Sequence, residues 1–212
     1  EREVLVMEKT VYGLLVSMAE AMIEAEPQLT ELDSALGDGD CGQGMKAGFT
    51  AVLDAIKEQD SVQELLKKTA MAMISAIGGT SGAIYGTAFM KLGATVSKAE
   101  QITPEVVCEA LVNALEGAKM RGEGTVVGDK TLIDALEPAV YAFKDAVLNG
   151  DDYAAAVTKA RKAAEIGSES TIQLIAKKGR ASYLGERSIG HRDAGSYGIV
   201  VLCQAAEKYL NS

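Results

Sequence analysis

The 212-residue chain contains no tryptophan and only three phenylalanines, although 48% of its residues are hydrophobic. The apolar residues are mostly alanine, leucine, valine, isoleucine and methionine. Such residues favour helices with small, close contacts over the aromatic and β-branched strands of a β-sandwich. We therefore expect an all-α protein, organised as a single domain over residues 1–212.

Cysteine and histidine are also scarce. The three cysteines, Cys41, Cys108 and Cys203, form no C-x-x-C pair, and His191 is the only histidine. A disulfide framework and a two-histidine metal site within one chain are thereby disfavoured. The chain starts with a charged amphipathic stretch where a signal peptide would be apolar, so a reducing cytoplasm is the expected compartment.

Clustered basic residues and long apolar runs are missing as well. The net charge is −9, and no block of lysine or arginine occurs, which argues against nucleic acid as a direct partner. No apolar run approaches the roughly 20 residues that span a bilayer, so no membrane partner is expected.

Acidic residues and glycines are instead concentrated in one stretch, D-S-A-L-G-D-G-D-C-G-Q-G, from Asp33 to Gly44. Asp33, Asp38 and Asp40 are hard oxygen donors of the kind Mg²⁺ prefers, and the glycines let backbone N–H groups approach an anion. The alternative is a solvated acidic turn. An EF-hand is excluded, because counting from Asp38 places Phe49 at the glutamate position.

Apolar residues spaced three and four apart predict eight helices. They run from Val4 to Ala25, from near Gln43 to Ile56, from about Val62 to Ile77, from Ala83 to Val96, from Pro104 to Met120, from Thr131 to about Leu148, from Asp152 towards Lys178, and from Gly195 to Leu210. Glycine-rich loops at 37–44, 78–82, 122–128 and 179–195 are two helices apart. In an up-and-down bundle such loops share one end, so all four can meet around one ligand.

Further candidate residues lie in the later loops. In G-G-T-S-G, residues 78–82, the Thr80-Ser81 pair is expected to cap a helix whose N–H groups cradle a phosphate, or to form an ordinary capped turn. Arg180 is either a phosphate-binding or a surface arginine. Lys130 has the same alternatives, and a third as a partner of Asp129 or Asp134. The Walker A and D-F-G signatures are absent, and so is the full protein-kinase catalytic-loop signature H-R-D-L-x-x-x-N.

Four motifs together carry a family resemblance: G-D-G-D-C-G, G-G-T-S-G, G-D-K-T-L-I-D-A-L-E-P-A and G-R-A-S-Y-L-G-E-R-S-I-G-H. In this order they resemble the nucleotide-binding L-subunit of dihydroxyacetone kinases, which also occurs as the C-terminal domain of single-chain kinases. The match covers almost the whole chain. It implies eight antiparallel amphipathic helices in an up-and-down closed barrel, with the nucleotide site at one rim.

The resemblance also implies residue roles. Asp33, Asp38 and Asp40 match the ligands of a pair of Mg²⁺ ions, Leu132 matches an adenine contact, and Arg180 matches a phosphate-facing arginine. The implied catalytic set is the three aspartates with Arg180. The implied ATP/ADP contacts are Cys41, Gly42, Gln43, Gly44, Thr80, Ser81, Gly122, Leu132, Arg180, Asp193, Ala194 and Gly195.

The implied activity is transfer of the γ-phosphoryl group of Mg-ATP to a dihydroxyacetone-like ketose. In the family this ketose is held on a separate K-type subunit, so we expect the chain alone to be inactive as a kinase. In one alternative, permanently bound ADP is rephosphorylated by a phosphohistidine protein. Members of that type commonly carry histidine and asparagine where this chain has Cys41 and Gly44. Ala194 also departs from the family, which usually has proline there. A homodimer is left open.

The methionine-rich helices suggest a different class of function. Met7, Met18, Met22, Met71 and Met73 would be ordinary core residues in a packed bundle. In a hollow bundle they would line an apolar pocket, and the chain would be a non-catalytic module that binds lipids or other hydrophobes. That alternative does not explain the aspartate cluster.

Overall fold

Regular structure in the described part of the chain is entirely helical. The computed structural model describes the backbone of residues 2–212 and the side chains of residue 7 and of residues 10–212. No strand occurs in residues 2–212, which confirms the all-α prediction. Val4, the first apolar position of the predicted N-terminal helix, lies outside the residues whose side chains are described. None of the described helices combines the length and apolar content needed to cross a bilayer.

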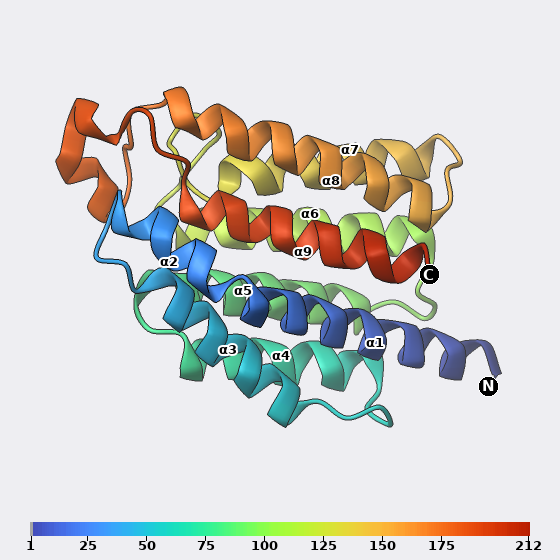
Figure 1. Cartoon of the computed structure of the whole chain (residues 1–212). Helices are drawn as coiled ribbons and strands as arrows, with labels where there is room; N and C mark the ends of the chain where they lie inside the picture. Colours follow the sequence, from blue (N-terminus) through green and yellow to red (C-terminus); the bar gives the residue numbers. More distant parts are fainter. Residues whose placement is uncertain (1) are drawn as a thin grey trace.

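The helices follow one another along the chain through short connections (Figure 1). In order they are α1 (Arg2–Glu24), α2 (Glu26–Ser34), α3 (Cys41–Ala55), α4 (Val62–Ala76), α5 (Gly79–Val96), α6 (Pro104–Arg121), α7 (Ile133–Leu148), α8 (Tyr153–Ser170), the 3₁₀ helices η1 (Thr171–Gln173) and η2 (Arg180–Ser188), and α9 (Ala194–Leu210).

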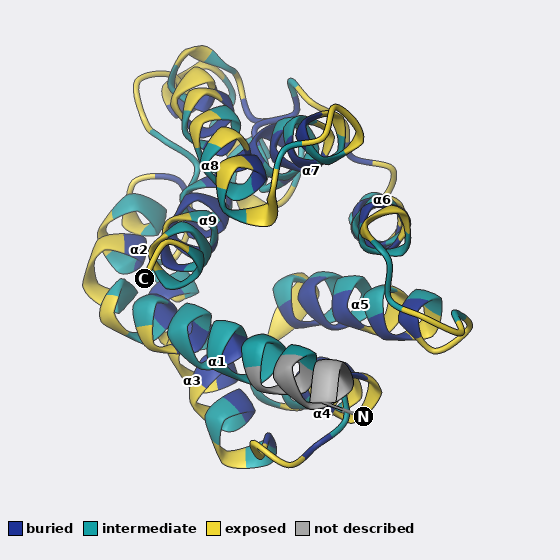
Figure 2. Ribbon diagram, turned by 90° about the vertical axis from the view of Figure 1, so that its right-hand side faces the viewer, coloured by how far each residue is buried: buried dark blue, intermediate teal, exposed yellow. Residues whose placement is uncertain are grey.

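Eight of these helices pack side by side in a ring. From α3 to α9 each α-helix contacts the next, and α1 packs against both α3 and α9. Figure 2 shows the helices arranged around a common centre, and Figure 1 shows that consecutive long helices run in opposite directions. The ring corresponds to the eight antiparallel helices expected from the sequence. The short α2 is an addition that packs on α3 and α9.

Small residues allow the helices to approach closely, as the composition predicts. Gly167 of α8 lies against the backbone of α7, where a Cβ atom would overlap the carbonyl oxygen of Asp134. The methionines do not share one pocket: Met22 and Met73 are buried in the core, whereas Met71 is 58% exposed. Fully buried alanines include Ala19, Ala70, Ala135, Ala156 and Ala164.

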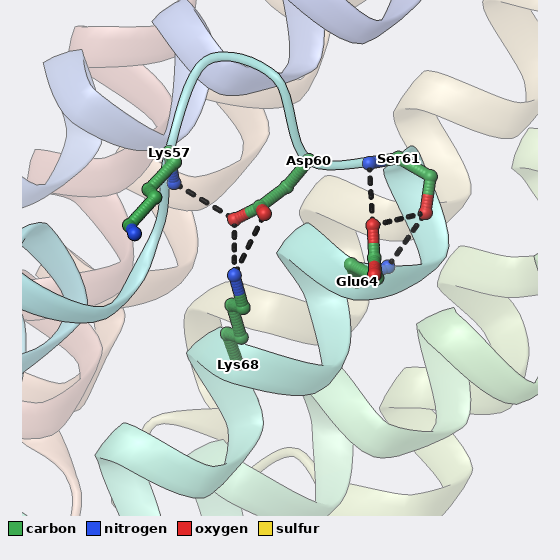
Figure 3. A network of polar contacts seen from close by, with 5 residues as sticks. All are labelled: Lys57, Asp60, Ser61, Glu64 and Lys68. Atoms are coloured by element: carbon green, nitrogen blue, oxygen red, sulfur yellow. Dashed lines mark hydrogen bonds and ion pairs between the residues drawn. The ribbon is translucent and has the colours of Figure 1, made fainter.

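The turn between α3 and α4 is stabilised by polar contacts (Figure 3). Ser61 and Glu64 form a capping box at the start of α4, in which each side chain accepts a hydrogen bond from the other residue's backbone N–H. The carboxylate of Asp60 accepts hydrogen bonds from Lys68 Nζ at 2.7 Å and from Lys57 N at 2.8 Å. The bond from Lys68 is the main reason why the pKa of Asp60 lies below its usual range.

Three segments differ from the helices predicted from the sequence. One is α5, which begins at Gly79 and not at Ala83. Pro27 suggests the end of a helix, but it occupies the first turn of α2, where its missing N–H costs nothing. The predicted helix towards Lys178 ends at Ser170 instead. There the hydroxyls of Ser170 and Thr171 donate to the carbonyl oxygens of Gly167 and Ser168, so that side-chain hydrogen bonds compete with continuation of the helix.

Candidate functional site

The glycine-rich loops meet at one end of the helix ring, around a cavity of about 710 Å³. The cavity is lined by the α2–α3 loop, the start of α5, the segment between α6 and α7, and the segment before α9. These segments lie together at one end of the molecule, opposite the α3–α4 turn (Figure 1). The volume falls in the range of ligand pockets. The convergence predicted from loops two helices apart is therefore confirmed.

Three carboxylates form a cluster on one wall of this cavity. Asp33 lies in the last turn of α2, Asp38 in the following loop, and Asp40 directly before α3. One oxygen atom from each lies within 4.8 Å of the others, with Asp33 half-buried and the other two exposed. Carboxylates this close repel one another unless a cation neutralises them, and three hard oxygen donors suit Mg²⁺. The residues present therefore fit a divalent cation.

Local hydrogen bonds bring the three carboxylates together. The backbone N–H of Gly37 donates to the carbonyl oxygen of Asp33 at 2.6 Å, and that of Cys41 donates to Asp33 Oδ2 at 3.2 Å. Gly39 has φ = 75°, a left-handed conformation in which glycine is favoured. The loop thus folds back over the end of α2, which places Asp38 and Asp40 beside Asp33.

The guanidinium group of Arg180, which is distant from the aspartates in the sequence, completes this wall. Arg180, at the start of η2, forms an ion pair with Asp38 through Nη1. Both side chains are exposed, and both residues line the cavity. A guanidinium at this position is suited to bind phosphate oxygens.

The start of α5 forms another wall. Gly78 precedes the helix, and Gly79, Thr80 and Ser81 in its first turn also line the cavity. The prediction that the Thr-Ser pair caps the helix is wrong: the N-cap residue is Gly78, and no side-chain cap bond is formed. The first N–H groups of the helix have no intrahelical acceptor and create a positive end that favours anions.

The segment between α6 and α7 is held in place by buried polar groups. Gly122 and Leu132, at its two ends, line the cavity. Asp134 accepts hydrogen bonds from the backbone N–H groups of Gly128 and Thr131, both at 2.7 Å. Asp129 pairs with Lys177 at 3.3 Å. Asp129 and Asp134, the two carboxylates considered as partners of Lys130, thus bond to other groups.

Lys130 does not form the ion pair with Asp129 or Asp134 that was one of the three alternatives for it. Its Nζ atom donates instead to the carbonyl oxygens of Thr171 and His191, both at 2.5 Å. Burial lowers the pKa of this ammonium group. His191 itself is exposed in its loop.

Asp193 starts α9 at the edge of the cavity, followed by Ala194 and Gly195. Its carboxylate accepts a hydrogen bond from the backbone N–H of Ser196 at 2.6 Å. Burial raises the pKa of Asp193 to about 7, although this hydrogen bond acts in the opposite direction. Asp134 nearby raises it further, whereas the Lys130 ammonium lowers it.

The start of α3 gives a mixed result for the predicted contacts. Cys41, Gln43 and Gly44 line the cavity. Gly42 faces α2 instead, where a Cβ atom would overlap the backbone of Glu26. Burial, followed by the charge of Asp33, raises the pKa of the Cys41 thiol to about 12, so this cysteine is a poor nucleophile.

Several lining residues were not anticipated from the sequence. The apolar ones belong to the turns next to the glycine-rich loops and include Leu36, Met45, Ile77, Ile84 and Ile133. All but Ile133 lie one or two residues outside a glycine-rich loop, and this position is the signal that could have identified them. Tyr85 also lines the cavity, is 5% exposed, and has a hydroxyl group without a hydrogen-bond partner among the described residues.

Fold and site together define a class: an all-helical protein with a rim cavity in which a carboxylate cluster, a helix N-terminus and an arginine surround one space. An apolar side next to such polar groups is typical of small-molecule and cofactor pockets.

Comparison with known proteins identifies the family. The DAK2 domain model matches residues 35–208. The chain is 39% identical over 200 residues to the ADP-binding subunit DhaL of a PEP-dependent dihydroxyacetone kinase from Listeria innocua, covering 91% of this chain and 90% of the relative. It is 36% identical over 179 residues to the corresponding Escherichia coli subunit, covering 83% and 84%.

A solved structure shows the same fold. The native dihydroxyacetone kinase of C. freundii superposes with a TM-score of 0.75 at 24% identity, over 93% of this chain and 34% of that longer chain. The chain belongs to the DhaL family, the nucleotide-binding subunits of dihydroxyacetone kinases.

Proposed function

We propose that this chain binds a magnesium nucleotide in the rim cavity and acts as the phosphoryl-transfer subunit of a short-ketose kinase. The observation that carries the proposal is the cavity itself. It brings three carboxylates with oxygens within 4.8 Å together with the free N–H groups at the start of α5. The names of the relatives support the same class, since those from Listeria innocua and Escherichia coli are named as ADP-binding kinase subunits.

In this proposal Asp33, Asp38 and Asp40 hold the metal, a pair of Mg²⁺ ions by family resemblance. When bound there, Mg²⁺ would supply positive charge that neutralises the nucleotide phosphates. Thr80 and Ser81, in the first turn of α5, would bind phosphate oxygens through backbone N–H groups and hydroxyls.

The remaining lining residues have complementary roles. Arg180 would leave Asp38 and donate to the transferred phosphoryl group, where charge develops. Leu132 and the apolar side chains of the cavity would contact the adenine ring. Asp193, Ala194 and Gly195 would complete the site. Gly122, Gln43 and Gly44 would contact the nucleotide through their backbones.

The ketose would come from a K-type partner. Nothing in the sequence resembles the family's ketose-binding module, so the purified chain should have no triose kinase activity alone. ATP is the donor that we propose first. A phosphohistidine protein acting on bound ADP is the second candidate, because the relatives from Listeria innocua and Escherichia coli are named as PEP-dependent. Retention of ADP through purification and slow exchange with added nucleotide would favour the second.

Calorimetric titration of ADP and ATP, with Mg²⁺ or with chelator, tests the proposal. Binding should require Mg²⁺ and should be lost in Asp38→Ala. Asp54→Asn, an exposed carboxylate at the far end of α3, is the matched control and should bind like the wild type. If the wild type binds no nucleotide under either condition, the proposed function is wrong.

A further inference from the structure

The proposed mechanism gives no role to Lys130, although its side chain is deeply buried. It is 2% exposed, the largest of the fully buried side chains in the described part of the protein. Its backbone has φ = 63°, a left-handed conformation that a residue other than glycine rarely adopts. Among the described residues no carboxylate lies within ion-pair distance of Nζ. Burying an ammonium group is costly unless it is paired and hydrogen-bonded, so the two acceptors of Lys130 are central to its position.

The two acceptors of Lys130 lie on either side of one segment. Thr171 immediately precedes and His191 immediately follows residues 172–190, which we call the closing segment, and Nζ donates to the carbonyl oxygens of both at 2.5 Å. One buried cation therefore connects the two ends of the closing segment to the segment between α6 and α7.

Other hydrogen bonds support the same base. The backbone N–H of Gly190 donates to the carbonyl oxygen of Ile172 at 2.8 Å, and that of Ala176 donates to the buried Ser188 hydroxyl at 2.9 Å. Two hydrogen bonds thus join the beginning and the end of the closing segment to each other at its base.

The middle of the closing segment is held differently. Tyr183 at its tip is 88% exposed, and Ser182 bonds only to the neighbouring Gly179. Across residues 179–187 the ion pair between Arg180 and Asp38 is the polar side-chain contact to the rest of the described chain. The position of Arg180 over the carboxylate cluster therefore depends on how the base is oriented and on two bonds just before it, from the backbone N–H of Lys177 to the carbonyl oxygen of Asp129 and from Lys178 Nζ to that of Glu123.

We propose that Lys130 is a positioning residue that fixes the base of the closing segment so that Arg180 reaches the metal and phosphate site. The part of this inference that concerns nucleotide binding rests on the proposed function. The part that concerns how the closing segment is held does not. It differs from a direct role for Lys130 in phosphate binding, because it requires Lys130 to act through Arg180.

The structural test is hydrogen exchange on the unliganded chain. Lys130→Met keeps the length of the side chain but removes all donors, and it should accelerate exchange in peptides covering 171–193 by about tenfold or more. Arg187→Met is the matched control, because its cation lies in the closing segment and is exposed. Unchanged exchange in folded Lys130→Met would overturn the proposal.

The binding test is a double-mutant cycle with Mg-ADP. Lys130→Met should weaken binding about tenfold in the wild-type background and less than about twofold in Arg180→Ala, since a contact that is already absent cannot be lost again. An equal loss in both backgrounds would mean that Lys130 acts independently of Arg180, and would also overturn the proposal.

Folding is checked by thermal unfolding of each variant. If Lys130→Met does not fold, Lys130→Gln, which retains an N–H donor, takes its place in both tests. If neither folds, Lys130 is a core residue only and the inference fails. If the wild type does not bind Mg-ADP, the proposed function is wrong, whereas the exchange experiment still decides whether Lys130 holds the base.

Discussion

Arg180 and Asp38, 142 positions apart in the sequence, form an ion pair at the mouth of the cavity. The pair joins the closing segment to the carboxylate cluster. Because both side chains are exposed, the pair adds little to stability, since such pairs contribute about 0–1 kcal/mol. Its importance lies in where it places a guanidinium group.

Arg180→Ala should therefore separate binding from stability. We expect the melting temperature of the unliganded chain to change by no more than a few degrees, and Mg-ATP affinity to fall by about tenfold, because a charge-assisted bond to phosphate is lost. Calorimetry and thermal unfolding measure the two effects. Arg187→Ala, an exposed arginine in the same 3₁₀ helix, should change neither. Equal losses of affinity in the two variants would contradict the assignment of Arg180.

Asp193 should make the stability of the unliganded chain depend on pH. Its pKa is about 7 in the folded state, against about 3.9 in an unfolded chain. Between these values the folded state binds more protons, so this residue's contribution to the free energy of unfolding falls as pH rises from about 4 to about 7.

Asp193→Asn removes this titration and keeps an acceptor for the N-cap bond from Ser196. The free energy of unfolding of the variant, relative to that of the wild type, should therefore increase as the pH rises from 4 to 8. Urea unfolding at several pH values measures the difference. Parallel stability curves for the two proteins would show that Asp193 is not protonated by burial near neutral pH.

Gly167 should be the least replaceable glycine at the contact between α7 and α8. In Gly167→Ala the new methyl group would overlap the carbonyl oxygen of Asp134, and backbone cannot move aside as a side chain can. We expect a loss of about 1–3 kcal/mol in the free energy of unfolding. Gly93→Ala, in α5, is the control: its Cβ would lie 3.4 Å from Leu66, so better helix propensity should leave stability unchanged or slightly higher. If both variants unfold at the same denaturant concentration, the close helix contact is wrong.

The parts of this site that could be predicted from sequence are those encoded locally. The Asp-Gly stretch from Asp33 to Gly44 and the start of α5 carry their chemistry in adjacent residues, and helix periodicity places both at one end of the bundle. The acceptors of Lys130 lie 41 and 61 residues away and are backbone carbonyls, which no side-chain pattern marks. The helix α2 was missed because Pro27 is equally compatible with a helix start and a helix end.

Tyr85 provides a final test of how the cavity is built. Its ring packs edge-on against Phe49 with centroids 6.5 Å apart, while its hydroxyl is buried without a partner among the described residues. A buried hydroxyl without a hydrogen bond costs roughly 1–3 kcal/mol, and Tyr85→Phe removes it while keeping the ring. The unliganded variant should therefore be as stable as the wild type or more stable. Tyr197→Phe, which loses a 2.6 Å hydrogen bond to Gln28, should be neutral or slightly destabilised. A clear loss of stability in Tyr85→Phe would mean that the hydroxyl is bonded in solution, with a water molecule in the cavity as the available partner.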